Sequence, residues 1–333
     1  MPILRSTYLS VFILASISAS LPAQTVETPI YEQGKTSIKE NQEEFIQKAL
    51  KIREEIAAIS KAEIEKQLLE PKPEPIKLSP AFTRELTTED IAEHARKSNL
   101  RVGYCYKCMN CDQWHLNLAG GYAITPNVIV TCDHVLASKT KMKDGFIIAI
   151  DYQGNVACAV SILAHSANMD AAIIKVAGAK FTPVSLNSYI KQGSSSYCFS
   201  YPLSQEGYFS TGIVNRFYWK GSDSDKDKES IDALCYLRLN YSNEWAPGSS
   251  GSPLFDAKGN ATGHVSTISG LSGGKGQPIY LLMHEGIPAR SVQQLVATLQ
   301  NPSEIKRLAM IKVEESTPAP IDSSDKQKKP LEK

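Results

Sequence analysis

The sequence lacks a net charge of either sign. Its 333 residues include 36 Lys and Arg and 35 Asp and Glu, giving a formal net charge of +1 at pH 7. Nucleic-acid-binding domains concentrate positive charge, so this balance argues against a nucleic-acid partner. No internal repeat of fixed period is present either, which excludes a solenoid or propeller built from repeats.

Long apolar runs are absent after the N-terminus, so we expect no stable membrane span. Residues 1–23 contain the basic Arg5, an apolar core from Tyr8 to Ile17, and then small residues. This order is typical of a secretory signal peptide, and the apolar core is short for a membrane-spanning helix. We therefore predict a signal peptide at 1–23 and export to the periplasm or the extracellular space, with an uncleaved anchor as the alternative.

Residues 24–75 are predicted to form a helical pro-segment or docking arm that ends in a Pro-rich linker. Apolar residues spaced by four, three, four and three positions line one helix face: Phe45, Ala49, Ile52, Ile56 and Ile59. The pattern is too short to indicate a coiled coil. The sequence "PKPEP" at 71–75 ends the helix, because proline removes a backbone donor and fixes φ.

Between about residue 100 and residue 285, short β-type runs alternate with Gly, Asn, Asp and Pro. Many short strands without intervening long helices are typical of a sandwich or barrel. Residues 291–301 have the pattern of a closing helix, and the polar tail at 314–333 is predicted to be disordered. We therefore expect an all-β domain at 85–301 with helical segments before and after it.

Three segments contain side chains that can cooperate in nucleophilic catalysis. "ITPNVIVTCDHVLA" ends a strand-like run at His134, "HSANMDAAIIKV" places Asp170 before an apolar strand, and "APGSSGSPLF" places Ser250 in a turn. A serine hydroxyl needs a base to take its proton, and a carboxylate can hold that base in the required tautomer. Each residue alone has an ordinary structural explanation, but their order in a β-rich sequence indicates a joint role.

In this order the three segments resemble the trypsin-like (chymotrypsin-fold) serine peptidases, especially exported bacterial types similar to HtrA-like and glutamyl-endopeptidase-like proteases. The resemblance covers about residues 99–298. It implies two six-stranded Greek-key β-barrels, protein or peptide substrates, an acyl-enzyme intermediate and no cofactor. It assigns His134 as the base, Asp170 as the orienting acid and Ser250 as the nucleophile. We expect no PDZ domain after residue 290.

The resemblance also assigns residues that contact the substrate. The backbone N–H groups of Gly248 and Ser250 would form the oxyanion hole, and a glycine at 248 allows the peptide to turn its N–H inward. Ser266 matches the strand position whose backbone pairs with substrate. Glu244, six residues before Ser250, matches the acidic base of the trypsin S1 pocket. A surface loop acid is the interpretation that we favour for Glu244.

One departure from the family pattern concerns activation. Ser249 stands where zymogen-type members keep an aspartate, and no I-V-G-G-type start is visible. We therefore infer that activation through that ion pair is absent. The alternative function is a catalytically inactive protein of the same fold that acts as a binding module.

Seven cysteines are present, and three of them lie close together near the start of the β-rich region. Cys105, Cys108, Cys111 and His115 have a spacing that suits a tetrahedral zinc site. Predicted export favours disulfides instead, and their connectivity cannot be deduced from spacing. We expect disulfides and no metal, with zinc at these four residues as the lesser alternative.

Overall fold

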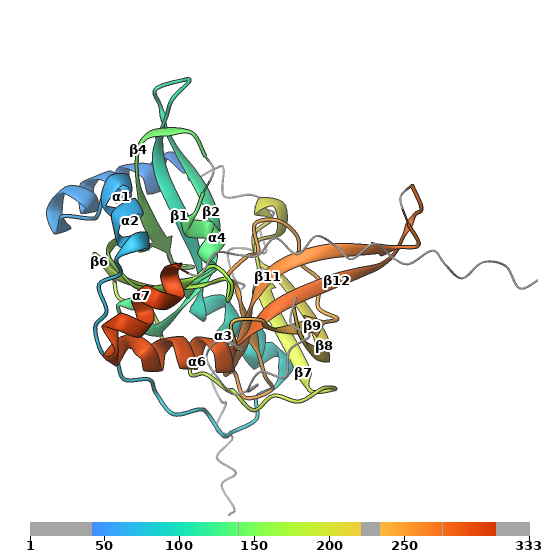
Figure 1. The fold of residues 1–333 in the computed structure, drawn as a ribbon. Helices are drawn as coiled ribbons and strands as arrows, with labels where there is room; N and C mark the ends of the chain where they lie inside the picture. The colour runs from blue at the N-terminus through green and yellow to red at the C-terminus, as the bar shows by residue number, and fades with distance from the viewer. Residues whose placement is uncertain (1–41, 139, 221–233, 275, 311–333) are drawn as a thin grey trace, which may run out of the picture. The chain divides into compact units, whose positions relative to one another are not determined.

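Two closed antiparallel β-barrels of six strands each form the body of the protein, which confirms the predicted fold class (Figure 1). The computed structural model describes residues 42–138, 140–220, 234–274 and 276–310. The predicted signal peptide at 1–23 and the predicted disordered tail at 314–333 lie outside the described residues, so both stay predictions.

The first barrel has the strand order β1-β2-β3-β6-β5-β4, in which the sixth strand returns beside the third as in a Greek key. Its interior is filled by apolar side chains such as Val102, Ile129 and Ile174. Alternation along each strand directs these side chains inward. The strands are β1 Asn99–Cys108, β2 Trp114–Thr125, β3 Val128–Thr131, β4 Met142–Ile150, β5 Val156–Ser166 and β6 Ala171–Ala177.

The second barrel repeats this design in the order β10-β11-β12-β9-β8-β7. Val214, Leu239 and Leu254 belong to its core. The hairpin of β11 and β12 extends well beyond the barrel (Figure 1). The strands are β7 Ser195–Ser200, β8 Tyr208–Trp219, β9 Leu237–Tyr241, β10 Pro253–Phe255, β11 Ala261–Ser272 and β12 Ile279–Pro288.

Two N-terminal helices, α1 (Gln42–Ile56) and α2 (Lys61–Leu69), pack against the first barrel. Phe45 and Ala49 of α1 are buried in one cluster with strand residues. The side chain of Gln67 in α2 accepts a hydrogen bond of 2.8 Å from the backbone of β5. Both helices fall within the segment 24–75, whose role as a pro-segment or docking arm stays a prediction.

The remaining helices join and close the barrels. α3 (Thr88–Ser98) is capped by Thr87, whose hydroxyl accepts from the backbone of Asp90 at 3.1 Å. The C-terminal helical region buries Val292 and Leu295 in a cluster that contains residues of both barrels. The short elements are α4 (Asp133–Leu136), η3 (Pro202–Ser204), α6 (Ala289–Ala297), η4 (Thr298–Gln300) and α7 (Pro302–Met310).

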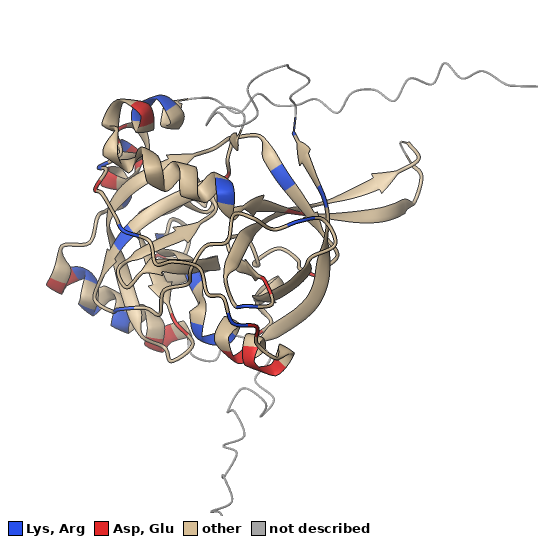
Figure 2. Cartoon of the chain, turned by 90° about the horizontal axis from the view of Figure 1, so that it is seen from below, with Lys and Arg blue, Asp and Glu red and all other residues tan. Residues whose placement is uncertain are grey.

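Charges of both signs are mixed on the surface of the helices (Figure 2). In α1, for example, Lys48 and Glu44 form an ion pair of 2.7 Å one turn apart. No helix among the described residues is long and apolar enough to cross a membrane.

Candidate active site

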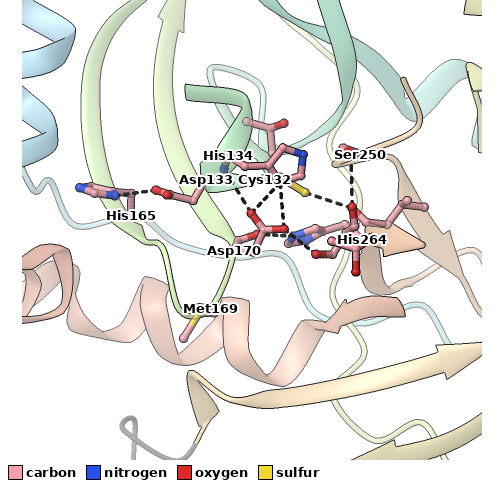
Figure 3. Close-up of polar contacts among 12 residues, drawn as sticks. Cys132, Asp133, His134, His165, Met169, Asp170, Ser250 and His264 are labelled. Carbon is pink, nitrogen blue, oxygen red and sulfur yellow. Dashed lines mark hydrogen bonds and ion pairs between the residues drawn. The ribbon is translucent and has the colours of Figure 1, made fainter. Parts of the chain in front are cut away.

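His134, Asp170 and Ser250 come together at a cavity of about 800 Å³ that both barrels line. His134 lies in the short helix α4, Asp170 directly precedes β6, and Ser250 lies in the turn before β10. The first two therefore come from the first barrel and Ser250 comes from the second. Figure 3 shows how the three side chains are arranged.

The carboxylate of Asp170 holds one side of the His134 ring. Its two oxygens lie 2.9 and 3.1 Å from Nδ1, and Oδ1 also accepts from the His134 backbone at 3.2 Å. Because the proton on Nδ1 is bonded to the carboxylate, Nε2 of a neutral ring is left as an acceptor. This is the tautomer that a general base requires.

Burial and ionic contact act in opposite directions on the pKa values of this pair. Burial would lower the pKa of His134, but the hydrogen bond and the charge of Asp170 outweigh it and raise that pKa above its usual value. Burial would raise the pKa of Asp170, but hydrogen bonds from His134 and Ser266 hold it well below its usual range. Asp170 is therefore ionised at neutral pH.

Two residues of β11 donate hydrogen bonds to Asp170. The Ser266 hydroxyl donates to the Asp170 carboxylate at 2.5 Å, and Nε2 of His264 donates to the Asp170 carbonyl oxygen at 3.1 Å. Burial lowers the pKa of His264 to about 4, so this ring is neutral at pH 7. Sequence reasoning had assigned Ser266 a backbone role only and had given His264 none. The signal was their spacing of two, which places both on one strand face.

The Ser250 hydroxyl points into the cavity and donates to the backbone oxygen of Ser266 at 3.3 Å. Among the hydrogen bonds of the described residues, none joins the Ser250 hydroxyl to His134. A separation of 3.3 Å is long for a hydroxyl donor, whose usual distance to an oxygen is about 2.7–2.8 Å. The hydroxyl is thus held only weakly in this orientation.

The turn around Ser250 depends on two glycines in the left-handed region. Gly248 has φ +101°, and a side-chain carbon there would lie 2.7 Å from the backbone oxygen of Tyr201. Gly251 has φ +84°, and a side-chain carbon there would lie 2.3 Å from the backbone oxygen of Gly120. Only glycine fits both positions.

Backbone hydrogen bonds join this turn to the rest of the molecule but leave two amides free. Ser250 accepts from the Gly120 amide at 2.6 Å, and the Gly251 amide donates to Val265 at 2.7 Å. In the part of the chain that the structure describes, the N–H groups of Gly248 and Ser250 have no internal acceptor. These are the two amides that the resemblance assigned to an oxyanion hole.

Ser249 is fully buried, and its hydroxyl donates to the Ser200 hydroxyl at 3.1 Å. An aspartate at this position could pair with a newly formed N-terminus, but a neutral hydroxyl inside the second barrel cannot. The turn is therefore held without the ion pair that zymogen-type members use.

Glu244 does not line the cavity, which agrees with the surface loop acid that we favoured over an acid at the base of the S1 pocket. Its carboxylate instead accepts from the Tyr208 hydroxyl at the surface. The acid that lines the cavity is Glu285 of β12, with Lys220 and Arg238 beside it. The Lys220 ammonium lies 3.1 Å from the Glu285 carboxylate.

Glu285 is buried and remains charged. Burial would raise its pKa, but the Tyr218 hydroxyl, Lys220 and Arg238 together lower it. Sequence reasoning missed Glu285, because neither its distance from Ser250 nor its neighbours distinguish it from other strand residues.

All seven cysteines lie within the described residues, and all are free thiols, so the predicted disulfides are not shown. Five of the thiols are buried, Cys108 is half-buried and Cys111 is exposed. Cys158 is packed between the first barrel and α1, Cys198 lies in the core of the second barrel, and the Cys132 thiol donates to the Val265 carbonyl at 3.1 Å. Cys105 is buried in the same cluster as Cys158, apart from the other residues of the expected zinc set.

Residues 119–263 match the family model described as a trypsin-like peptidase domain. The match begins in β2, ends in β11 and includes all three side chains that meet at the cavity. No curated protein matches the chain. The family match and the two six-stranded barrels agree with each other, and protein or peptide substrates follow from the family. The chain therefore carries a trypsin-like peptidase domain built on the chymotrypsin fold.

Proposed function

We propose that the protein is a serine endopeptidase in which Ser250 is the nucleophile, His134 the general base and Asp170 the orienting acid. One observation carries this proposal. The buried Asp170 carboxylate lies 2.9 Å from Nδ1 of His134, in a cavity that Ser250 also lines. A carboxylate in this position selects the imidazole tautomer that can accept the serine proton.

The reaction would proceed in two balanced stages. Ser250 Oγ attacks the substrate carbonyl carbon while its proton passes to Nε2 of His134, and the tetrahedral intermediate collapses as that proton moves to the leaving amine. Water then attacks the acyl-serine ester and gives one proton to His134, which returns it to Ser250 Oγ. The free amides of Gly248 and Ser250 would donate to the oxyanion in both stages.

The Ser250 hydroxyl must turn from the Ser266 carbonyl to the His134 ring before it can react. Its present bond of 3.3 Å is weak, so rotation about the Cα–Cβ bond costs little. Catalytic hydrogen bonds are often long or misaligned before the substrate binds. The substrate carbonyl, once held by the two amides, would favour the reactive orientation.

The first test uses a fluorophosphonate probe on the wild type and on the Ser250→Ala and His134→Ala variants. We expect covalent labelling of the wild type at Ser250, no labelling of Ser250→Ala, and a large decrease in rate for His134→Ala. A folded wild-type protein that takes no label would support the alternative, a catalytically inactive binding module on the same fold.

We also propose export to the periplasm or the extracellular space, on the basis of the signal-peptide pattern at residues 1–23. Expression of the full chain in a bacterial host, followed by fractionation and N-terminal sequencing, tests this. Mature protein that begins near residue 24 outside the cytoplasm is the expected result, and a cytoplasmic chain that retains Met1 contradicts the proposal.

A further inference from the structure

The tip of the β1–β2 hairpin brings together three side chains that the proposed peptidase mechanism does not use. Cys108 ends β1, Cys111 lies in the connecting turn, and His115 lies near the start of β2. One donor atom from each of these residues lies within 4.8 Å of the other two. None of the three residues lines the cavity that contains Ser250.

Strand pairing places the imidazole beside the thiols. His115 is the cross-strand partner of Tyr106, and the Cys108 amide donates to the Gln113 carbonyl at 2.9 Å to close the turn. As a result, the Cys111 sulfur lies 3.0 Å from Nε2 of His115. Asp112 has φ +57°, which bends the chain sharply between the two cysteines and the second strand.

The same turn directs a backbone N–H group at the sulfur of Cys108. The amide of Asn110 lies 3.4 Å from the Cys108 sulfur and donates to it. The same N–H group could donate to this sulfur in a metal-bound thiolate, and hydrogen bonds of this kind to a ligand atom orient it toward the metal.

We propose that Cys108, Cys111 and His115 bind one zinc ion at the tip of this hairpin. Two sulfurs and one imidazole nitrogen are ligands that zinc prefers, and a C-x-x-C pair with a nearby histidine is a spacing that recurs in its sites. Binding would release the remaining thiol protons to the solvent as the Zn–S bonds form. A water molecule would complete the tetrahedron.

Neighbouring residues explain why the site has three protein ligands. Cys105, the fourth member of the expected set, is buried between the first barrel and α1, where burial raises the pKa of its thiol to about 12. The Asp112 carboxylate is engaged by Lys143 at 2.8 Å and by Lys107 at 3.4 Å. Two thiolates neutralise the charge of the ion, so these lysines do not exclude it.

A cobalt titration of the full-length chain tests this site. The protein is reduced, freed of metal with a chelator and titrated with Co²⁺, a spectroscopic substitute for zinc. We expect one equivalent to bind with the intense visible absorption of tetrahedral cobalt and with sulfur-to-cobalt charge transfer, and one equivalent of Zn²⁺ to abolish both signals. No such signals in the reduced wild type would overturn the proposal.

Variants identify the ligands. Cys108→Ser, Cys111→Ser and His115→Ala should each lose or strongly weaken the cobalt signal, whereas Asp112→Asn and Cys158→Ala should keep it. Asp112→Asn changes the same hairpin tip without removing a proposed ligand, and Cys158→Ala removes a buried thiol that lies between the first barrel and α1, outside the hairpin tip. An unchanged signal in the three ligand variants, or an equal loss in Asp112→Asn, would overturn the assignment.

A measurement on the wild type avoids any dependence on variant folding. Alkylation of the reduced protein, followed by peptide mass mapping, should modify Cys108 and Cys111 rapidly without metal and slowly with one equivalent of Zn²⁺. Equal alkylation with and without zinc would contradict the proposal. Prior oxidation to a Cys108–Cys111 disulfide should abolish cobalt binding, and oxidised protein that still binds cobalt would also contradict it.

Discussion

Asp170 is the residue on which the geometry of the candidate site depends. It is buried, has φ +50°, and contacts His134 and Ser266 through its carboxylate and His264 through its carbonyl oxygen. A non-glycine residue in the left-handed region costs about 1–3 kcal/mol and persists only where the surroundings hold it. The contacts with these three residues supply that support.

Replacement of Asp170 by asparagine tests its orienting role at nearly constant size. We expect Asp170→Asn to fold and to lower kcat on the order of 10⁴-fold, because an amide can hold Nδ1 in the wrong tautomer. Peptide hydrolysis and circular dichroism measure activity and folding. Asp133→Asn is the matched control, since Asp133 bonds to His165 at 2.6 Å outside the cavity (Figure 3), and it should lower kcat far less. Equal losses in both variants would contradict the role of Asp170.

The raised pKa of His134 determines a pH dependence. The mechanism needs neutral His134, so the rate of fluorophosphonate labelling should increase as the pH rises through a midpoint above about 6.5, the usual histidine value. The effect on stability has the opposite direction. The His134–Asp170 ion pair stabilises the fold fully below the unfolded pKa, and this contribution is lost as the pH rises through the folded pKa. A labelling midpoint below 6.5 would contradict this assignment.

At the scale of elements, hydrogen bonds tie the turn before β10 to both barrels. Leu203 donates to Pro247 at 2.7 Å, and Gly120 of the first barrel donates to Ser250 at 2.6 Å. The free amides of Gly248 and Ser250 are therefore held in position by both barrels before any substrate arrives. Such preorganised donors are usually the largest single contribution to catalysis.

Gly248→Ala tests whether catalysis depends on the position of the Gly248 amide in this turn. A side-chain carbon 2.7 Å from the Tyr201 oxygen would displace the amide, and we expect kcat to fall about 10²-fold or more. Gly193→Ala is the matched control, because Gly193 has φ +83° but open space around it. It should cost about 1–2 kcal/mol of stability and leave kcat unchanged. Hydrolysis rates and urea unfolding measure the two effects, and an unaltered kcat in Gly248→Ala would exclude Gly248 from the oxyanion hole.

At the scale of the whole molecule, the cavity exists because two barrels pack together. One cluster contains Tyr122 and Val130 of the first barrel together with Phe255 and Ile287 of the second. An ion pair of 2.9 Å between Arg101 of β1 and Glu206 before β8 also joins them. Arg101 lies over the rings of Phe45 and Tyr201, at 5.1 and 5.6 Å from their centres.

Removal of this ion pair should loosen the contact between the barrels. We expect Arg101→Met to lower the free energy of unfolding by about 1–3 kcal/mol, because it leaves the partly buried Glu206 without a partner. Arg101→Met combined with Glu206→Gln should recover part of the loss. Burial already raises the pKa of Glu206, so the loss should be largest above that pKa and smaller below it, where Glu206 is protonated.

Denaturant unfolding at several pH values measures these changes. Lys61→Met provides the comparison, because Lys61 pairs with Glu65 on the solvent-facing side of α2. This substitution should change the free energy of unfolding by less than about 1 kcal/mol. An Arg101→Met effect no larger than that of Lys61→Met would show that the ion pair does not couple the barrels.

Local patterns in the sequence were sufficient to predict much of this architecture. Short β-type runs separated by Gly, Asn, Asp and Pro predicted the strands, and the order of His134, Asp170 and Ser250 predicted which side chains meet. The helix predicted at 291–301 corresponds to α6 and η4, which cover Ala289–Ala297 and Thr298–Gln300. These patterns are readable because strand and helix periodicity depend on neighbouring residues.

Local sequence patterns were enough to predict the all-β character of the domain and the side chains of the candidate site. Tertiary contacts were needed to show that Ser266 and His264 support Asp170, that Glu285 lines the cavity, and that Cys105 is separated from the cysteines of the hairpin tip. These contacts depend on residues that are far apart in the chain. Barrel closure and strand register determine them.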